Sequence, residues 1–216
     1  MTGKYYFIGA GLILLVLAMT AIAYPHLPER VPTHWDAHGN INGWSDKSRL
    51  FVIEPAMMSG ILILFWALPW LSPKHFEVDS FRTTYLFIMV VLLATLAYVH
   101  ALILAAGLSW QIDVGRAVLG GVCLLNALLG NVLGKVRRNF YVGIRTPWTI
   151  ANEQVWYATH RLAAKTFFAA GLLGLVAVIF RAPFWLPVAV ILAGALIPAI
   201  YSFAFYKRLE RHGELS

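Results

Sequence analysis

Apolar residues gather along the chain into six long runs that are separated by shorter polar stretches. A helix needs about 20 predominantly apolar residues to cross roughly 30 Å of hydrocarbon. We therefore predict an all-α integral membrane protein in which residues 1–216 form a single membrane domain. The six predicted transmembrane helices of this bundle are Tyr5–Ala23, Phe51–Leu71, Thr84–Leu108, Ala117–Gly134, Leu162–Phe180 and Phe184–Tyr206.

The composition supports this prediction. Hydrophobic residues make up 60% of the chain and charged residues 12%, whereas soluble domains carry about 25% charged residues. A water-soluble globule, a disordered chain and a disulfide scaffold are therefore excluded. Cys123 lies in an apolar run, where we expect it to act as a small apolar residue in a helix.

The first apolar run also has features of a signal peptide. Lys4 precedes it, and the small residues Ala21-Ile22-Ala23 follow, as they do at a cleavage site. The apolar run is long for a signal peptide, and we expect a retained helix.

The distribution of basic residues predicts the orientation. The net charge is +7, and most of the 17 Lys and Arg residues lie in segments on the same side of the membrane as the N-terminus. Cytoplasmic loops carry such an excess. We therefore predict that both termini are cytoplasmic and expect no direct binding of nucleic acid.

Two connecting loops are long. Residues 24–50 form an external loop in which three prolines favour extended backbone and later Asn-Gly positions favour turns, so we expect this loop to be ordered. The long cytoplasmic loop contains Pro147 and then good N-cap residues near 149–152. A short amphipathic helix is predicted there, with Glu153, Trp156 and His160 on one face.

Two stretches resemble a known family. Residues 130–161 contain Gly-Asn, a basic residue, Asn, then Gly-Ile-Arg-Thr-Pro-Trp-Thr, and finally Trp and Thr-His-Arg. This run resembles the core motif of the SdpI family of bacterial membrane proteins. The external stretch from Leu27-Pro28 to Lys47 is similar to the N-terminal domain of unknown function that often accompanies that motif.

The resemblance implies a non-enzymatic immunity and sensor protein of the bacterial inner membrane, with no cofactor. Its partners would be the lipid bilayer, a secreted antimicrobial peptide toxin of the SDP type, and a cytoplasmic transcriptional repressor that it recruits to the membrane.

Two sets of candidate site residues follow. The cytoplasmic set would form a partner or signalling site, although a basic loop lying on anionic lipid is an alternative: Asn131, Lys135, Asn139, Gly143, Arg145, Thr146, Pro147, Trp148, Trp156, Thr159, His160 and Arg161. The external set would face the peptide: His34, Trp35, Asp36, Gly39, Trp44 and Glu54.

Other functions remain open. His34, Asp36 and His38 point the same way in an extended chain and are candidate Zn²⁺ ligands, which would make the protein a metal-dependent membrane enzyme; solvated histidines beside an Asx turn are the alternative. A small transporter would need a polar path through the membrane. Asn126 is the polar residue that we expect at the membrane midplane.

Polar residues inside apolar runs are costly in lipid and therefore informative. Glu54 is expected to pair with His100 or Arg181, or to cap the start of its helix. Asn126 is expected to form a hydrogen bond between helices. Gly130 and Gly134 are spaced for close helix packing.

Overall fold

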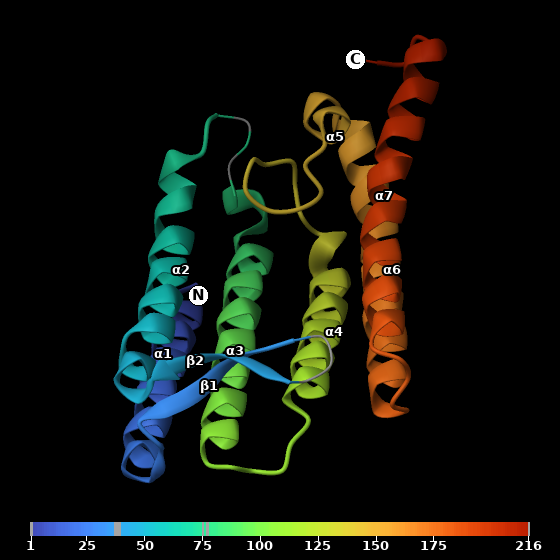
Figure 1. Ribbon diagram of the computed structural model, residues 1–216. Coiled ribbons are helices and arrows are strands. Elements are labelled where there is room, and N and C mark those ends of the chain that lie inside the picture. Colours follow the sequence, from blue (N-terminus) through green and yellow to red (C-terminus); the bar gives the residue numbers. More distant parts are fainter. Residues whose placement is uncertain (1, 37–39, 75, 77, 216) are drawn as a thin grey trace. The chain divides into compact units, whose positions relative to one another are not determined.

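The structure is a computed structural model, and it describes residues 2–36, 40–74, 76 and 78–215. Within these ranges six helices are long and apolar enough to cross a membrane (Figure 1). They are α1 (Gly3–Ala23), α2 (Ile53–Leu71), α3 (Arg82–Gly107), α4 (Val114–Leu133), α6 (Glu153–Ile179) and α7 (Trp185–Arg211). The chain is therefore a multi-pass membrane protein, as its apolar runs predicted.

The fifth spanning helix differs most from its prediction. It begins at Glu153 rather than Leu162, because its first turns are polar and an apolar run does not reveal them. A separate helix, α5 (Pro147–Ala151), precedes it, and Asn152 between the two helices has an extended backbone. The prediction that Glu153, Trp156 and His160 belong to a separate amphipathic helix was thus wrong, since they lie in the first turns of α6.

The chain forms two compact units. Unit 1 comprises residues 1–66 and 89–122, and unit 2 comprises residues 67–88 and 123–216. Helices α2, α3 and α4 contribute residues to both units.

Unit 1 contains a small sheet that the all-α prediction did not include. Strands β1 (Arg30–Trp35) and β2 (Ile41–Asp46) pair in antiparallel fashion, with Arg30 opposite Asp46 and Val31 opposite Ser45. The 3-10 helices η1 (Tyr24–His26) and η2 (Lys47–Phe51) flank the strands. We call residues 24–50 the hairpin region. It lies against the ends of α1 and α3 (Figure 1).

Apolar side chains hold the hairpin region on these helices. Leu27 and Val31 are buried in a cluster with Ala23, Leu50, Ile103 and Leu104. A Cβ atom at Gly107 would lie 2.7 Å from Cδ2 of Leu27 and 3.3 Å from Cγ1 of Val31 in β1, so the hairpin region can approach closely because α3 ends in a glycine. The sheet is thus packed onto the helices.

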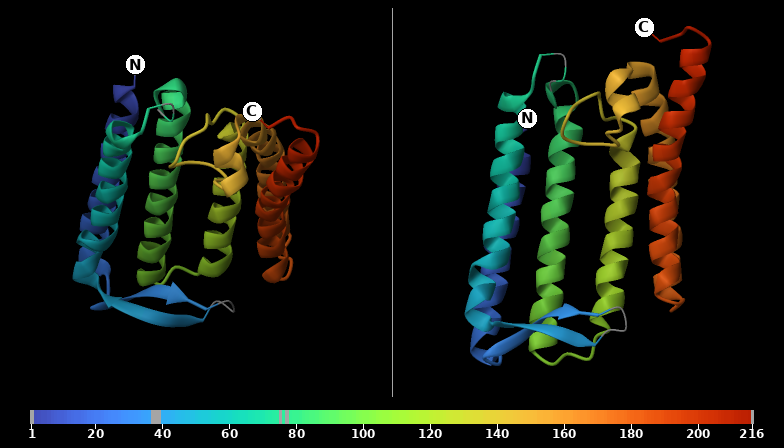
Figure 2. Two further views of the ribbon diagram at one scale, coloured as in Figure 1. Left: turned by 90° about the horizontal axis from the view of Figure 1, so that it is seen from above. Right: turned by 45° about the horizontal axis from the view of Figure 1, so that its top comes forward.

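In unit 2, helices α6 and α7 run side by side, as both views in Figure 2 show. The second half of α4 packs closely on α6, because a Cβ atom at Gly130 would overlap the backbone of Phe168. The side-chain amide of Asn126 donates a hydrogen bond of 2.8 Å to the carbonyl oxygen of Phe167. The predicted close packing and interhelical hydrogen bond are therefore both confirmed.

Candidate functional site

The connection between α4 and α6 is folded mainly by side chains that bond to its backbone. We call residues 134–152 the motif loop; it lies where α6 begins and α7 ends (Figure 2). Asn139 is fully buried, and its amide oxygen accepts hydrogen bonds from the N–H groups of Tyr141 (2.7 Å) and Val142 (2.8 Å). Its amide nitrogen donates to the carbonyl oxygens of Arg137 and Val142. One buried side chain therefore closes the turn of residues 137–142.

His160 fixes the next part of the motif loop. Nδ1 of its buried ring contacts the carbonyl oxygen of Trp156 at 2.8 Å, and Nε2 accepts a hydrogen bond of 3.0 Å from the N–H of Ile144. These partners assign the proton to Nδ1. The indole of Trp156 stacks on the imidazole with ring centroids 4.1 Å apart and donates to the carbonyl oxygen of Val136. Trp156 and His160, on adjacent turns of α6, thus hold the loop backbone at Val136 and Ile144.

Gly143 allows the backbone to approach His160. Its φ is +115°, and a Cβ atom there would overlap Nε2 of His160. Both the left-handed backbone and the contact therefore require glycine at this position.

Threonines begin helix α5. Thr146 is its N-cap, and each of Thr146 and Thr149 accepts a hydrogen bond from the other's backbone N–H. Pro147 follows at the first helical position, where a missing N–H costs nothing. The hydroxyl of Thr146 also contacts that of Ser202 at 3.0 Å, and Trp148 packs on Phe203. These contacts attach α5 to α7.

The predicted cytoplasmic residues divide by burial. Asn139, Trp156, Thr159 and His160 are buried within unit 2, whereas Asn131, Lys135, Arg145 and Arg161 are exposed. Arg145 donates a hydrogen bond to the carbonyl oxygen of Phe140. Asn139, Trp156 and His160 therefore shape the loop, whereas the hydroxyl of Thr159 makes no hydrogen bond to the described residues. The exposed basic members are available to a partner.

A basic hollow of about 680 Å³ opens beside the motif loop within unit 2. It includes Lys135 and Arg161 of the predicted set together with Asp79, Arg82, Arg137 and Tyr157, which sequence reasoning did not select. Arg137 donates to the hydroxyl of Tyr157 at 3.0 Å, and this bond raises the pKa of the guanidinium. The charge excess of the loop pointed to Arg137, but Arg82 joins the hollow from a distant part of the chain.

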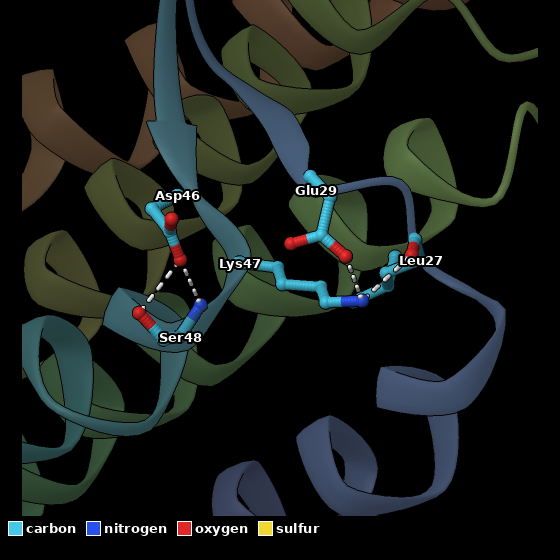
Figure 3. Close-up of polar contacts among 5 residues, drawn as sticks. All are labelled: Leu27, Glu29, Asp46, Lys47 and Ser48. Carbon is cyan, nitrogen blue, oxygen red and sulfur yellow. Dashed lines mark hydrogen bonds and ion pairs between the residues drawn. The ribbon is translucent and has the colours of Figure 1, made fainter.

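Polar contacts join the start of the hairpin region to its end (Figure 3). Nζ of Lys47 lies 3.0 Å from Oε1 of Glu29 and donates to the carbonyl oxygen of Leu27 at 3.3 Å. Asp46 accepts hydrogen bonds from the N–H (2.8 Å) and the hydroxyl (2.6 Å) of Ser48. These bonds lower the pKa of the Asp46 carboxyl and cap η2.

The predicted external residues mostly lie on this hairpin. Nδ1 of His34 contacts Oδ1 of Asn42 at 2.5 Å, and Asp36 accepts from the backbone N–H of Asn40 at 2.9 Å. Trp44 is half exposed. His38 and Gly39 lie outside the described residues. Among the residues that the structure describes, no three His, Cys, Asp or Glu side chains converge as metal ligands.

Glu54 is not part of the hairpin region. It lies in a buried cluster of polar side chains from three helices. One oxygen of Glu54 contacts Nδ1 of His100, as one of the two predicted pairings proposed. Nε2 of His100 lies 2.7 Å from the hydroxyl of Thr20, which donates to the carbonyl oxygen of Val16. Nε2 must therefore carry a proton and donate it.

The remaining proton of this cluster lies between the imidazole and the carboxyl group. Whether Glu54 or His100 holds it, the pair carries no net charge. This neutrality lowers the cost of burying two ionisable groups among apolar helices, and the cluster joins α1, α2 and α3 within unit 1.

Comparisons with known proteins match both regions. Residues 135–202 match the SdpI/YfhL protein family, and residues 11–59 match a domain of unknown function, DUF1648. The chain is 25% identical to the immunity protein SdpI of Bacillus subtilis (strain 168) over 201 residues, which is 92% of this chain and 94% of that protein. No solved structure matches. The resemblance predicted from the sequence is therefore confirmed.

Proposed function

Because this chain is similar to the immunity protein SdpI along most of its length, we propose that it is a membrane immunity protein that protects a bacterial cell against a secreted antimicrobial peptide of the SDP type. The observation that carries this proposal is the extent of the similarity. The two family matches cover the whole hairpin region, with both of its strands, and most of the motif loop. The likeness is therefore not confined to apolar helices, whose composition many membrane proteins share.

We place the hairpin region outside the cell and the motif loop in the cytoplasm. Lys135, Arg137, Arg138 and Arg145 belong to the motif loop, and such an excess of basic residues is typical of cytoplasmic segments. The hairpin region then meets the peptide. Half-exposed Trp44 and the carboxylates of Asp36 and Asp46 offer apolar and anionic contacts to a cationic, apolar peptide.

The motif loop would bind the cytoplasmic repressor. Its backbone is held by buried Asn139, Trp156 and His160, and Arg145 is exposed on it. A loop fixed in this way presents its exposed side chains in one arrangement, which lowers the entropic cost of binding.

The test is survival of a toxin-sensitive bacterium that expresses the chain while it is exposed to an SDP-type peptide. We expect the parent chain to raise the lethal peptide concentration. Arg145→Ala should reduce protection if the motif loop takes part, whereas Arg211→Ala, which removes an exposed arginine from the end of α7, should retain it. The amount of each variant in the membrane is measured alongside.

Absence of protection by a well-expressed parent chain would reject immunity to this peptide. Equal protection by the parent chain and Arg145→Ala would retain immunity and reject the role of Arg145. Recruitment is tested separately, by asking whether a fluorescent candidate repressor moves to the membrane when the peptide is added.

A further inference from the structure

The basic hollow of unit 2 carries an excess of positive charge. Among the residues that the structure describes, its lining contains four cationic side chains and one carboxylate, contributed by Arg82, Lys135, Arg137, Arg161 and Asp79. Asp79 pairs with Arg82 at 3.0 Å. Within the described part of the chain, Lys135 and Arg161 have no acidic group within ion-pair distance. The hollow therefore attracts an anion.

One donor in this hollow has no acceptor. Nε of Arg82 is buried and makes no hydrogen bond to the residues that the structure describes. A buried donor without a partner costs free energy, and this one belongs to a residue that lines the hollow. The hydroxyl of Tyr157 is a further polar group in the lining.

An apolar groove of about 470 Å³ continues from the hollow. Gly134 and Arg161 line both cavities, and the groove adds Ala158, Leu162, Ala164, Lys165 and Tyr201. A ligand that fills both must therefore be anionic at one end and apolar at the other.

We propose that the hollow and groove together bind one anionic phospholipid. The phosphate contacts Arg137, Arg161 and Lys135, and an acyl chain lies in the groove along Ala158 and Leu162. Guanidinium groups form strong, charge-assisted hydrogen bonds with phosphate. The site is at the ends of spanning helices, where the start of α3 and the end of α4 contribute residues, and lipid headgroups lie at this depth. The proposal does not rest on the immunity function.

The experiment measures lipid bound to the full-length chain by native mass spectrometry in a mild detergent. Phosphatidylglycerol is titrated against phosphatidylcholine with the same acyl chains. We expect one phosphatidylglycerol per chain and little phosphatidylcholine. Arg137→Gln/Arg161→Gln should weaken phosphatidylglycerol binding roughly tenfold or more. Arg208→Gln/Arg211→Gln makes the same change in charge on α7 and should leave binding unchanged.

A second variant tests the groove. Leu162→Trp fills it without removing a cation, and it should weaken binding of phosphatidylglycerol. Thermal unfolding of each variant without lipid shows whether the variant is folded.

Several results would overturn the proposal. Equal loss in the two double variants would show general attraction of lipid to a basic surface. Unchanged lipid binding by Leu162→Trp, or displacement of the lipid by inorganic phosphate at similar concentrations, would show a site for a soluble anion. Equal binding of phosphatidylcholine would show that the charge does not select the lipid.

Discussion

The hairpin region and the motif loop both connect spanning helices, but different interactions hold them in place. The hairpin region is held by strand pairing and by apolar side chains such as Leu27 and Val31. Its polar side-chain contacts are exposed, except that Lys47 is partly buried. The motif loop has little regular structure, and the buried polar side chains of Asn139 and His160 bind its backbone. We infer that polar substitutions in the motif loop disturb folding more than those in the hairpin region do.

The largest expected effect tests whether burial decides how much stability is lost when a polar partner is removed. It compares two carboxylates of unit 1, buried Glu54 and exposed Glu29. Glu54→Ala leaves a cavity and an imidazole nitrogen of His100 without its partner, which should destabilise the protein by about 4 kcal/mol. Glu29→Ala removes the exposed partner of Lys47 and should cost less than about 1 kcal/mol. Thermal unfolding in detergent compares the two variants.

The control for this comparison is Glu54→Gln, whose amide can donate to Nδ1 of His100. It should restore most of the stability lost in Glu54→Ala. Equal unfolding temperatures for Glu54→Ala and Glu29→Ala would contradict the inference that burial sets the cost.

Gly143 should be the most sensitive glycine of the motif loop. Gly143→Ala places a Cβ against Nε2 of His160 at a φ of +115°, and we expect a cost of about 3 kcal/mol from strain and overlap. Gly213→Ala is the matched control, because its φ is +68° but its Cβ would meet open space. If the two variants unfold at the same temperature, the contact with His160 does not matter.

The two asparagines compare the regions directly. Asn139→Ala removes four hydrogen bonds from a buried turn and should cost about 2 kcal/mol. Asn42→Ala removes an exposed contact with His34 and should change stability by less than about 0.5 kcal/mol. Hydrogen exchange of the amides of Tyr141 and Val142 should accelerate in Asn139→Ala, and unchanged exchange would refute the role of its side chain.

The smallest expected effect depends on pH. Hydrogen bonds from Ser48 lower the pKa of Asp46 below its ordinary value of 3.8, so the ionised carboxyl stabilises the hairpin region at neutral pH. This stabilisation is present above the ordinary pKa and is lost as the pH falls through the lowered one. Asp46→Asn should therefore unfold slightly earlier than the parent at pH 6, and the difference should shrink as the pH falls below 3.8. A constant difference would contradict this assignment.

The spanning helices could be predicted from the sequence because apolar runs of sufficient length have few alternatives in lipid. Five of the six predicted helices begin within three residues of the observed start. The exception is α6, whose first turns are polar and pack within unit 2, so no apolar run marks them. The hairpin was missed as a sheet because its strands are short and one contains proline.

The candidate site could be predicted in part. The spacing of Trp156 and His160 placed them on one helical face, and their rings do stack. No spacing rule revealed that Nε2 of His160 binds the N–H of Ile144, because that contact depends on how the loop folds back over α6. Arg82 was missed for a similar reason, since it lies more than 50 residues before the loop whose hollow it lines.

The sequence by itself determined the number of spanning helices and the resemblance to an immunity family, because length, hydropathy and a long motif are local properties of the chain. The tertiary structure decided which polar residues are buried and which remain exposed. Asn139 and Arg145 are six positions apart in one motif, yet the first closes a turn and the second faces outward. Burial depends on packing between distant segments, and no local pattern specifies it.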